Sequence, residues 1–491
     1  MTPQGITLRH PDKLFIDGEW VSAAKGRVFD VVSPNSEEVV ARVAEATEED
    51  MDRAVAAARR AFDAGDWRRT PPAERGRKLA LLAERLTARR GELQDAWVEQ
   101  IGGLPGMAVG VVGGGLRQLS TIASLGESFA WIEQVTPETC AAPLIVREPV
   151  GVVAAISPWN SPFMIMITKV AYTLVAGGSV IMKPSPETPL EAYIIAEEAE
   201  ALGFPKGVIN LVCGDREASD HLVNNPQVDK VSFTGSTVAG KRIAQVCGSR
   251  IARYSLELGG KSAAIVRDDM PTEDVARILG NTITLLSGQI CAMLTRAIVP
   301  RARHDELAEA IAGVMKQVKV GHSRDEGVQL GPLAMKRQLE RVEMYIAEGR
   351  KTADLVTGGQ RPAHINKGYF IEPTLFANVD NSSRIAQEEI FGPVLCLIPA
   401  DDEADMIRIA NDSNFGLHGS VLTKDADAAW RIAREMRTGM IGQNGMRTQH
   451  GMPFGGFKQS GVGREGGAEG LLPYIESKSI LLDAMPSMPL V

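Results

Sequence analysis

The spacing of apolar residues changes character near residue 150. Before that point most apolar positions recur at helical intervals, which predicts amphipathic helices over 47–64, 72–101 and 110–132. The segment 14–21 instead alternates around Asp17-Gly18, a pair typical of a hairpin turn. The stretch 136–148 is strand-like and interrupted by prolines, and we expect it to form an arm that leaves the main body.

From Val150 onward, short and continuous apolar runs alternate with helical segments. The predicted strands are 151–156, 179–182, 208–212, 230–233 and 254–258. Such alternation is typical of βαβ units, whose parallel sheet is covered by helices on both faces. A second α/β alternation follows and runs to about residue 442. The sequence therefore predicts an α/β protein with more than one parallel sheet.

Length, charge and cysteine content narrow the functional classes. A chain of 491 residues is too long for one ordinary core. The net charge of −8 argues against nucleic-acid and anionic-membrane partners. The five cysteines form no CxxC pair, which argues against a disulfide framework and a metal site. The unpaired cysteine pattern indicates a reducing compartment, and without a signal pattern near Met1 we expect the cytoplasm.

The longest apolar run, 163–182, is interrupted by Lys169 and Gly177-Gly178. It therefore predicts a buried helix followed by a buried strand; a membrane span is the minor alternative.

One cysteine, Cys291, lies in an unusual setting at the end of Ser287-Gly288-Gln289-Ile290-Cys291. A nearby glycine lets a ligand or another backbone segment approach the thiol closely. Because a thiolate is a strong nucleophile, we predict that Cys291 attacks a carbonyl carbon. The alternative is a buried cysteine that serves only as a small apolar side chain.

Polar side chains follow the first two predicted strands of the sheet, at the edge where parallel sheets bind ligands. Asn160 follows the first strand and, with the backbone N–H of Cys291, is placed to hold an oxyanion. Its alternative role is a turn between two prolines. Lys183 follows the second strand and is placed to bind ribose hydroxyls or a phosphate; the alternative is a solvated loop lysine.

The fourth and fifth strands end in further candidates. Gly235-Ser236-Thr237 opens a helix with free N–H groups and hydroxyls, which is either an anion site or an ordinary N-cap. Glu257 lies between two leucines, and an apolar environment raises the pKa of a carboxyl toward that of a general base. Its alternative role is an ion pair with Lys261.

Two more segments complete the set. Glu389 is placed to hold ribose hydroxyls, and Phe391 to stack beside a flat ring. The loop 453–461 is rich in glycine, and it either closes the cleft or is an ordinary surface loop.

Together and in this order, the motifs resemble the aldehyde dehydrogenase superfamily. The resemblance extends from Asp17-Gly18-Glu19-Trp20 to Glu476-Ser477-Lys478. It rests on Pro158-Trp159-Asn160, Lys183-Pro184-Ser185, Gly235-Ser236-Thr237, Glu257-Leu258-Gly259-Gly260-Lys261, Gly288-Gln289-Ile290-Cys291, Glu389-Ile390-Phe391-Gly392-Pro393 and Pro453-Phe454-Gly455-Gly456.

The resemblance implies an α/β fold with two Rossmann-like parallel-sheet domains and a small β oligomerisation arm. The NAD(P)-binding domain is expected over 1–127 and 148–257, and the catalytic domain over 258–445 with a loop to about 469 closing the cleft. The arm is expected over 128–147 and 470–491. A homodimer or homotetramer is implied as well.

The implied activity is oxidation of an aldehyde to its carboxylic acid with NAD(P)+, without transfer to coenzyme A. Cys291 carries the thiohemiacetal and the thioester, Asn160 holds the oxyanion, Glu257 activates the deacylating water, and Lys169 relays protons from Glu257. The implied cofactor contacts are Ile156, Pro158, Trp159, Lys183, Ser185, Pro186, Gly235, Ser236, Leu258, Gly259, Glu389 and Phe391. The implied substrate pocket comprises Phe163, Met164, Ile165, Thr168, Ile290, Ala292, Met446 and Arg447.

Two departures from the family pattern bear on specificity: Pro186, and the segment Ala292-Met293-Leu294-Thr295-Arg296, which is bulkier than the small residues and glycine that are common after the cysteine. Pro186 stands where NAD-preferring members often carry a glutamate that grips the adenosine ribose, so NADP stays an alternative to the expected NAD, and Glu187 is the residue that would compensate. The expected pocket is mostly apolar and rich in methionine, which favours a medium-chain, terpenoid or aromatic aldehyde. Arg447 is the exception and would suit a semialdehyde.

Three other reactions are weighed against this one. They are oxidation of a semialdehyde, CoA-acylating aldehyde oxidation, and hydrolysis by a cysteine esterase or thioesterase. A deacylating base such as Glu257 argues against transfer to coenzyme A. The nucleotide-binding candidates Lys183, Glu389 and Phe391 argue against simple hydrolysis.

Overall fold

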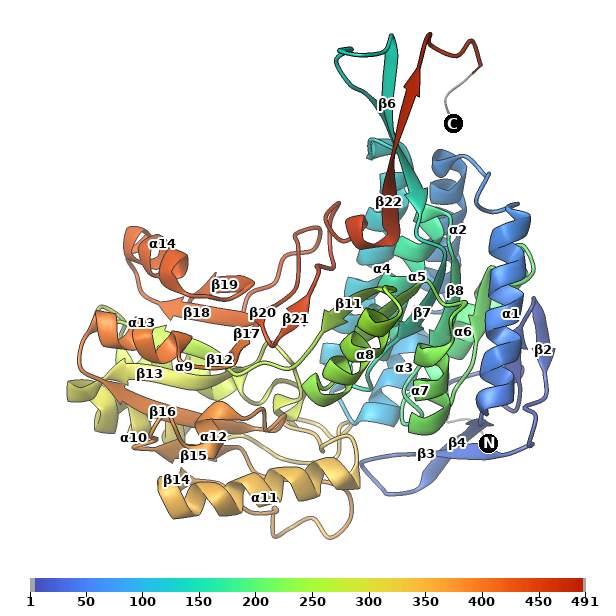
Figure 1. Ribbon diagram of the computed structural model, residues 1–491. Coiled ribbons are helices and arrows are strands. Elements are labelled where there is room, and N and C mark those ends of the chain that lie inside the picture. The colour runs from blue at the N-terminus through green and yellow to red at the C-terminus, as the bar shows by residue number, and fades with distance from the viewer. Residues whose placement is uncertain (1–4, 489–491) are drawn as a thin grey trace.

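The chain folds into two α/β bodies with a β arm projecting from one of them (Figure 1). This is a computed structural model, and it describes residues 5–488. The outer ends of the predicted NAD(P)-binding and arm ranges, 1–4 and 489–491, lie outside the described residues.

The first body is built on an eight-stranded sheet in the order β2-β1-β9-β8-β7-β10-β11-β21. Its central five strands run parallel, as predicted: β9 (Ile209–Leu211), β8 (Ser179–Lys183), β7 (Val152–Ile156), β10 (Lys230–Thr234) and β11 (Arg253–Glu257). Its antiparallel edges are β1 (Leu14–Ile16), β2 (Glu19–Val21) and β21 (Gly461–Val462). The predicted hairpin turn is confirmed, because Asp17 and Gly18 both have positive φ, 58° and 75°.

Helices cover both faces of this sheet, which explains its continuous apolar strands. One face packs against α2 (Pro72–Ala88), α3 (Arg90–Ile101), α4 (Pro105–Ser128), α5 (Pro162–Ala176) and α6 (Leu190–Ala201). The other packs against α1 (Glu48–Ala64), α7 (Arg216–Asn224) and α8 (Thr237–Ser249). Helix α1 begins after Thr47, which forms a capping box with Asp50, as its sequence predicts.

Some predicted helix boundaries shift in the structure. The expected helix over 110–132 begins earlier, at Pro105, because proline is favoured in the first turn, and it ends at Ser128. The apolar run 163–182 becomes the buried helix α5 and strand β8, which Gly177 separates with a φ of 97°. Across residues 5–488, the helices are too short or too polar to cross a membrane.

The second body is built on a seven-stranded sheet in the order β14-β15-β16-β13-β12-β18-β19. All but β14 run parallel. The bounds are β14 (Asp354–Thr357), β15 (Thr374–Ala377), β16 (Val394–Ala400), β13 (Leu294–Pro300), β12 (Ser262–Val266), β18 (His418–Leu422) and β19 (Met440–Gln443). One face packs against α11 (Lys336–Thr352), α12 (Arg384–Gln387), α13 (Glu403–Asn411) and α14 (Ala426–Glu435). The other packs against α9 (Thr272–Thr282) and α10 (His304–Lys316).

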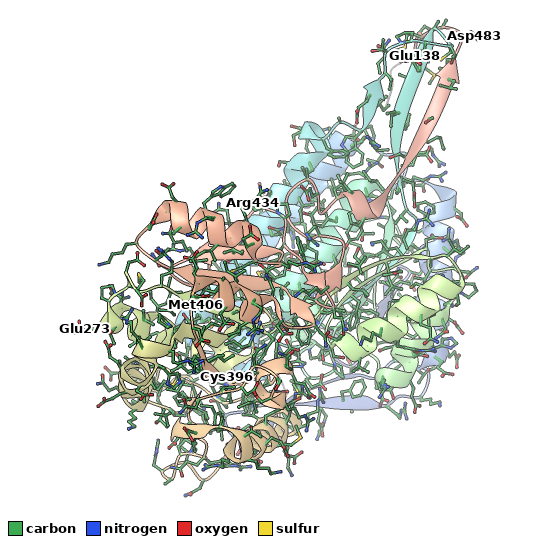
Figure 2. All side chains as sticks on the ribbon, turned by 60° about the vertical axis from the view of Figure 1, so that its left-hand side comes forward. Glu138, Glu273, Cys396, Met406, Arg434 and Asp483 are labelled. Atoms are coloured by element: carbon green, nitrogen blue, oxygen red, sulfur yellow. The ribbon has the colours of Figure 1, made fainter. Side chains whose placement is uncertain are left out.

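The arm is a three-stranded sheet that joins distant parts of the chain. Strand β6 (Ala142–Pro149) pairs antiparallel with β22 (Ile475–Leu482) over eight residue pairs and with β5 (Ile132–Gln134). Figure 2 shows Glu138 and Asp483 at its tip, far from both bodies. Two small ribbons complete the fold, β3 (Val28–Val32) with β4 (Val39–Ala44), and β17 (Phe415–Gly416) with β20 (Phe457–Lys458).

Candidate active site

The strand order creates a binding edge in the eight-stranded sheet. From β7 the chain adds β8 and β9 on one side and β10 and β11 on the other. Ligands of such sheets bind in the crevice outside the carboxyl ends of the two strands at which the order reverses. Here those ends are Ile156 of β7 and Thr234 of β10, which are followed by Pro158-Trp159-Asn160 and Gly235-Ser236.

A four-residue link joins the two sheets. Strand β11 ends at Glu257 and β12 begins at Ser262, so the carboxyl end of one sheet leads directly to the amino end of the other. The link is closely packed: a Cβ at Gly259 would collide with the Glu389 carboxylate, and one at Gly260 with the Cys291 carbonyl. The Gly260 N–H also donates to Oε1 of Glu389 at 3.0 Å. The two glycines therefore let Cys291 and Glu389 lie against the same link.

Cys291 lies in a strained segment that precedes β13. Leu286, Ser287 and Gly288 all have positive φ, between 47° and 73°. For Leu286 and Ser287 this conformation is costly, and such strain is concentrated at functional sites. Burial raises the pKa of the Cys291 thiol to about 12, and the Glu389 and Glu257 carboxylates add to the shift. The thiol is therefore protonated at neutral pH and needs a base before it can attack.

Asn160 is held firmly beside this segment. Its Nδ2 donates to the carbonyl oxygen of Gln289 at 2.9 Å, two residues before the cysteine. Its own carbonyl oxygen accepts from Nε1 of the fully buried Trp97 at 3.2 Å. Asn160 is thus more than a turn residue, since it connects the carboxyl end of β7 to the cysteine segment.

Glu257 has the environment that its sequence predicts. It is 5% exposed, and burial raises its pKa well above the ordinary value, with the Glu465 carboxylate as the next cause. Among the described residues no donor reaches its Oε2 atom, and no ion pair joins it to Lys261. Lys261 is itself buried, which lowers its pKa to about 8. The ion-pair alternative for Glu257 is therefore absent from the described structure.

Lys169 pairs with an acid, Glu465, that the sequence analysis missed. The buried Lys169 ammonium pairs with Glu465 and donates to the Ser232 hydroxyl at 3.2 Å. Its charge lowers the pKa of Glu257, while that of Glu465 raises it. The signal was present, because Glu465 lies among glycines in Gly463-Arg464-Glu465-Gly466-Gly467, much as Glu257 precedes a glycine pair.

The predicted cofactor residues line the same edge. Lys183 is 7% exposed, and its Nζ has only a long contact of 3.5 Å to the Gly214 carbonyl. Ser236 caps α8, where its hydroxyl accepts from the Ala239 N–H at 3.3 Å, and its side chain is exposed. A weakly satisfied cation at the end of β8 and an exposed helix cap at the end of β10 fit the ribose and phosphates of a dinucleotide.

The aromatic and acidic members of the cofactor set lie across from this edge. The ring of Phe391, whose φ is 62°, lies edge-to-face with Trp159 at 5.3 Å between centroids. Burial raises the pKa of Glu389 to about 7. Two other predicted contacts point into the core instead: Ile156 packs in the sheet, and Leu258 packs against Gly240 of α8.

The predicted substrate residues fall into two groups. Ile290 and Trp159 pack on one apolar cluster with Met107 and Val111 of α4, and Ile290 also packs on a second with Met446. Ala292, which follows Cys291 in the sequence, is buried, and Ile165 is half-buried. In the other group, Phe163 is fully buried in the core, and the Thr168 hydroxyl donates back to the Met164 carbonyl at 2.7 Å.

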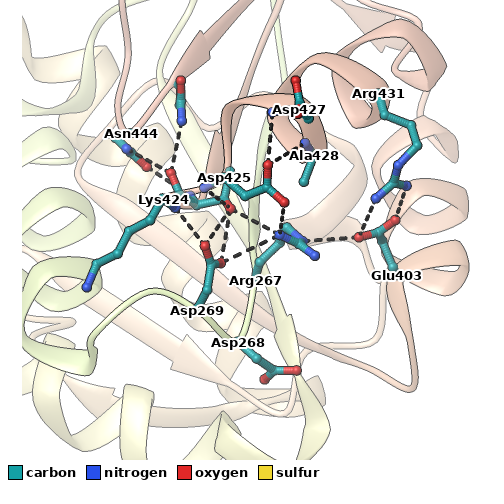
Figure 3. Close-up of polar contacts among 12 residues, drawn as sticks. Arg267, Asp268, Asp269, Glu403, Lys424, Asp425, Asp427, Ala428, Arg431 and Asn444 are labelled. Carbon is teal, nitrogen blue, oxygen red and sulfur yellow. Dashed lines mark hydrogen bonds and ion pairs between the residues drawn. The ribbon is translucent and has the colours of Figure 1, made fainter.

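The loop that carries Met446 and Arg447 is fixed at its base and docks on α4. The backbone of Asn444 is left-handed, with a φ of 57°. Its side-chain oxygen accepts from the Thr423 N–H and its Nδ2 donates to the Thr423 carbonyl, while Asp269 accepts from the Lys424 N–H (Figure 3). Arg447 is exposed and donates its Nε–H to the Gln443 carbonyl at 2.7 Å. Farther along, His450 lies 3.2 Å from the Arg117 guanidinium, a pair that the sequence did not reveal.

The glycine-rich loop after this segment is tied to both sheets. The Leu258 N–H donates to the Ser460 carbonyl at 2.9 Å, and the Gly416 N–H donates to the Ser460 hydroxyl at 2.9 Å. Strand β21 then joins β11 beside Glu257. The loop is therefore a fixed wall of the site and not a free surface loop.

Comparisons with known proteins agree with this geometry. The model of the aldehyde dehydrogenase family matches residues 20–480. A geranial dehydrogenase from Castellaniella defragrans is 42% identical over 479 residues, which cover 97% of this chain and all of that protein. A Mycobacterium tuberculosis aldehyde dehydrogenase complexed with NAD+ is 39% identical, with a TM-score of 0.93, and the match covers 99% of this chain and 100% of that one.

A second solved structure gives the same result. A betaine aldehyde dehydrogenase from Staphylococcus aureus in complex with NAD+ is 35% identical, with a TM-score of 0.94 and coverage of 98% of this chain and 96% of that one. The expected fold class, reaction class and cofactor class are confirmed. The chain belongs to the aldehyde dehydrogenase family and is an NAD(P)-dependent oxidoreductase.

Proposed function

We propose that the enzyme oxidises an apolar medium-chain, terpenoid or aromatic aldehyde through a covalent adduct on Cys291. The observation that carries the substrate class is the apolar wall made by Trp159, Ile290, Met107, Val111 and Met446. Methionine and aromatic side chains form an adaptable apolar surface. The 42% identity to a geranial dehydrogenase supports the same class.

Cys291 and Asn160 carry out the addition in this proposal. The thiol loses its proton to a base and its sulfur adds to the aldehyde carbon, which gives a thiohemiacetal oxyanion. The Asn160 amide has one N–H on Gln289, and its second N–H is left for the oxyanion, together with the backbone N–H of Cys291. Bound NAD(P)+ would supply the hydride acceptor here, and loss of hydride from the Cys291 adduct would leave a thioester on Cys291.

Glu257 carries out the deacylation. Water attacks the thioester while the Glu257 carboxylate takes one of its protons, which releases the acid and the Cys291 thiolate. A base for this step needs a pKa near the working pH, and burial with the Glu465 charge raises that of Glu257. Lys169, paired with Glu465, moderates this shift and is placed to pass the proton onward.

The cofactor is held at the reversal point of the first sheet. Lys183 and Ser185 would bind the adenosine ribose, Gly235 and Ser236 the pyrophosphate, and Glu389 the other ribose. Trp159 and Phe391 would flank the nicotinamide. Pro158, Pro186 and Gly259 would line the groove with their backbones. The poorly satisfied Lys183 ammonium and the exposed amino end of α8 support this placement.

A semialdehyde is the second candidate substrate, and one observation favours it. Arg117 and His450 meet at 3.2 Å where the 445–452 segment docks on α4, so a cation stands close to the expected pocket. A substrate carboxylate would be attracted there. Arg447, by contrast, donates to its own loop and is exposed.

The deciding experiment measures the absorbance of the reduced cofactor with purified enzyme and NAD+ or NADP+. The substrates are citral, octanal, benzaldehyde and succinic semialdehyde, and Cys291→Ala is the control. We expect turnover of the three apolar aldehydes and none in the variant. Turnover of the semialdehyde alone would overturn the apolar assignment. A requirement for coenzyme A would overturn the role of Glu257.

The division of labour and the assembly are part of the same proposal. Residues 1–127 and 148–257 bind the cofactor, 258–445 carry the cysteine, and 128–147 with 470–491 pair subunits into a homodimer or homotetramer. The projecting strands β6 and β22, with an exposed Leu481, support pairing through the arm. Light scattering after gel filtration, with a variant truncated before β22, tests pairing through the arm.

The five cysteines are unpaired, which supports the cytoplasm as the location.

A further inference from the structure

A fully buried histidine holds the segment that carries Met446. His418 begins β18, and its Nε2 lies 2.9 Å from the carbonyl oxygen of Arg447. Because a carbonyl can only accept, Nε2 carries a proton and donates this hydrogen bond. The acceptor belongs to the backbone of Arg447, so the contact fixes the path of the chain and leaves the guanidinium exposed.

A serine on the same strand holds the start of this segment. The Ser420 hydroxyl donates to the Gly445 carbonyl at 3.1 Å and accepts from the Gly445 N–H at 3.2 Å. Side chains two residues apart lie on the same face of a strand, so His418 and Ser420 share one face of β18. The segment therefore runs back along β18, with Gly445 over Ser420 and Arg447 over His418.

The segment also lies tightly against the neighbouring strand. A Cβ at Gly442 of β19 would come within 2.4 Å of the Gly445 carbonyl oxygen and 3.1 Å of the Arg447 Cβ. Met446, between these two fixed residues, is half-buried and packs on the same apolar cluster as Ile290. The hydrogen bonds from β18 thus determine where Met446 meets the wall beside the cysteine segment.

Burial of His418 has a cost that this contact explains. Burial lowers the pKa of the imidazole, so the ring is neutral at pH 7. Its second nitrogen, Nδ1, is buried and has no hydrogen-bond partner within residues 5–488. An unpaired buried polar atom is unfavourable for stability. An apolar side chain would avoid that cost, but it could not hold the Arg447 carbonyl.

We propose that His418, together with Ser420, is a positioning residue for the substrate wall, because it holds the Arg447 carbonyl and thereby keeps Met446 in place. In this role His418 touches neither aldehyde nor cofactor and acts only through the segment 445–447. It lowers the KM of long or branched aldehydes, whose chains extend to Met446, and has no effect on short ones. The inference rests on the proposed function, in which Met446 lines the substrate pocket.

The first test is tryptic cleavage after Arg447, which needs no aldehyde. Arg447 is exposed, and trypsin cuts the bond that follows it only when the backbone leaves its bound path. Mass spectrometry measures this cleavage relative to the other tryptic sites. His418→Leu and Ser420→Ala should each speed it about fivefold, the effect of losing one hydrogen bond. His418→Gln keeps an N–H donor and should stay close to the wild type.

Another buried histidine of the second body provides the matched control. His304 is 4% exposed, and its Nε2 accepts from the Asn378 N–H at 3.1 Å. It begins α10, beyond the carboxyl end of β13 and therefore at the opposite edge of the sheet from Cys291. His304→Leu should leave the relative cleavage after Arg447 unchanged, even where it lowers the Tm.

Steady-state kinetics with citral and propanal is the second test. We expect His418→Leu to raise the KM for citral about fivefold or more. The KM for propanal and the kcat for both aldehydes should stay within about twofold, because the reacting groups are unchanged. His418→Gln should restore most of the wild-type KM for citral.

Three outcomes would overturn the inference. Unchanged cleavage after Arg447 in His418→Leu, or an equal effect of His304→Leu, would show that His418 only supports the fold. Faster cleavage with an unchanged KM for citral would show that the segment does not shape the substrate wall. Failure of the wild type to oxidise citral would overturn the proposed substrate class and the effect on KM with it, whereas the cleavage assay would still report on the contact itself.

Discussion

The side-chain amide of Asn160 donates a hydrogen bond to the carbonyl oxygen of Gln289 across 2.9 Å. This contact joins the carboxyl end of β7 to the segment that leads into Cys291. It also fixes the direction of the amide, so the second N–H does not have to be oriented when the oxyanion forms. Preorganised donors of this kind are worth far more than mobile ones.

Asn160→Ala should therefore lower kcat by about 10²–10³-fold, the usual cost of losing one oxyanion donor. Binding of the cofactor, followed by quenching of tryptophan fluorescence, should change little. A parallel loss of cofactor binding and of thermal stability would instead identify Asn160 as a purely structural link.

Glu465→Gln should move the pH dependence of deacylation to lower pH. Glu465 raises the pKa of Glu257, and it also occupies the Lys169 ammonium, which lowers that pKa. Its neutralisation acts in the same direction through both groups. Deacylation needs the Glu257 carboxylate, so the rate should reach its plateau at lower pH than in the wild type.

The measurement is the rate of product release after the burst of reduced cofactor, from pH 5.5 to 9. Glu257→Gln is the control and should abolish the rising limb while the burst remains. An unchanged limb in Glu465→Gln would contradict the electrostatic coupling between the two acids.

The Cys291 thiol should react slowly with alkylating reagents in the free enzyme. Its pKa is raised to about 12 by burial and by the Glu389 and Glu257 carboxylates, and only the thiolate is nucleophilic. Alkylation by iodoacetamide should thus rise about tenfold per pH unit between pH 7 and 9. Glu389→Gln removes a negative neighbour and should make the reaction faster at pH 8.

Mass spectrometry of the peptide that contains Cys291 separates it from the other four cysteines. Glu388→Gln, at the exposed neighbouring position, is the matched control and should leave the rate unchanged. A slower reaction in Glu389→Gln would mean that Glu389 acts as a base for the thiol.

Glu191 should make the protein less stable as pH rises. It is fully buried, burial raises its pKa to about 8, and Gln100 donates to one of its oxygens at 2.6 Å. The folded state therefore holds a proton that the unfolded state loses near pH 4.3. This contribution to the free energy of unfolding is complete below about pH 4, falls as pH rises, and is lost by about pH 8.

Glu191→Gln, which is neutral at every pH, should remove that dependence. Its Tm should match the wild type near pH 4 and exceed it by a few degrees at pH 9, in line with a difference of a few kcal/mol. Differential scanning calorimetry provides the comparison. A constant difference in Tm across the pH range would show that Glu191 keeps its charge in the folded state.

Arg447→Ala should have little effect on apolar aldehydes, with kcat/KM within about twofold, because the guanidinium donates to the Gln443 carbonyl and is exposed.

Arg117→Ala should lower kcat/KM for succinic semialdehyde about tenfold or more if a substrate carboxylate is recognised near His450. Steady-state kinetics on citral and succinic semialdehyde check both. A large loss for citral in Arg447→Ala would show that Arg447 shapes the pocket.

Much of the fold follows from local patterns. The continuous apolar strands between 151 and 258 predict a doubly covered parallel sheet, since only buried strands tolerate apolar residues on both faces. Thr47 predicts the start of α1 through its capping box. Helix α4 was harder to delimit, because its glycines obscure the helical pattern and the packing of neighbours against them decides the outcome.

The candidate site divides along the same line. The sequence determined the chemical groups themselves: a cysteine after glycine, an amide and a lysine at strand ends, and an acid before two glycines. Each of these motifs is local, so the strand end or turn that presents the side chain can be recognised from its sequence neighbours. Tertiary structure alone decided which groups meet. It brought Glu465 to Lys169, Arg117 to His450 and Arg337 to Glu187, pairs separated by 296, 333 and 150 residues. No local pattern encodes such encounters, since they depend on how helices and loops from distant segments pack around the two sheets.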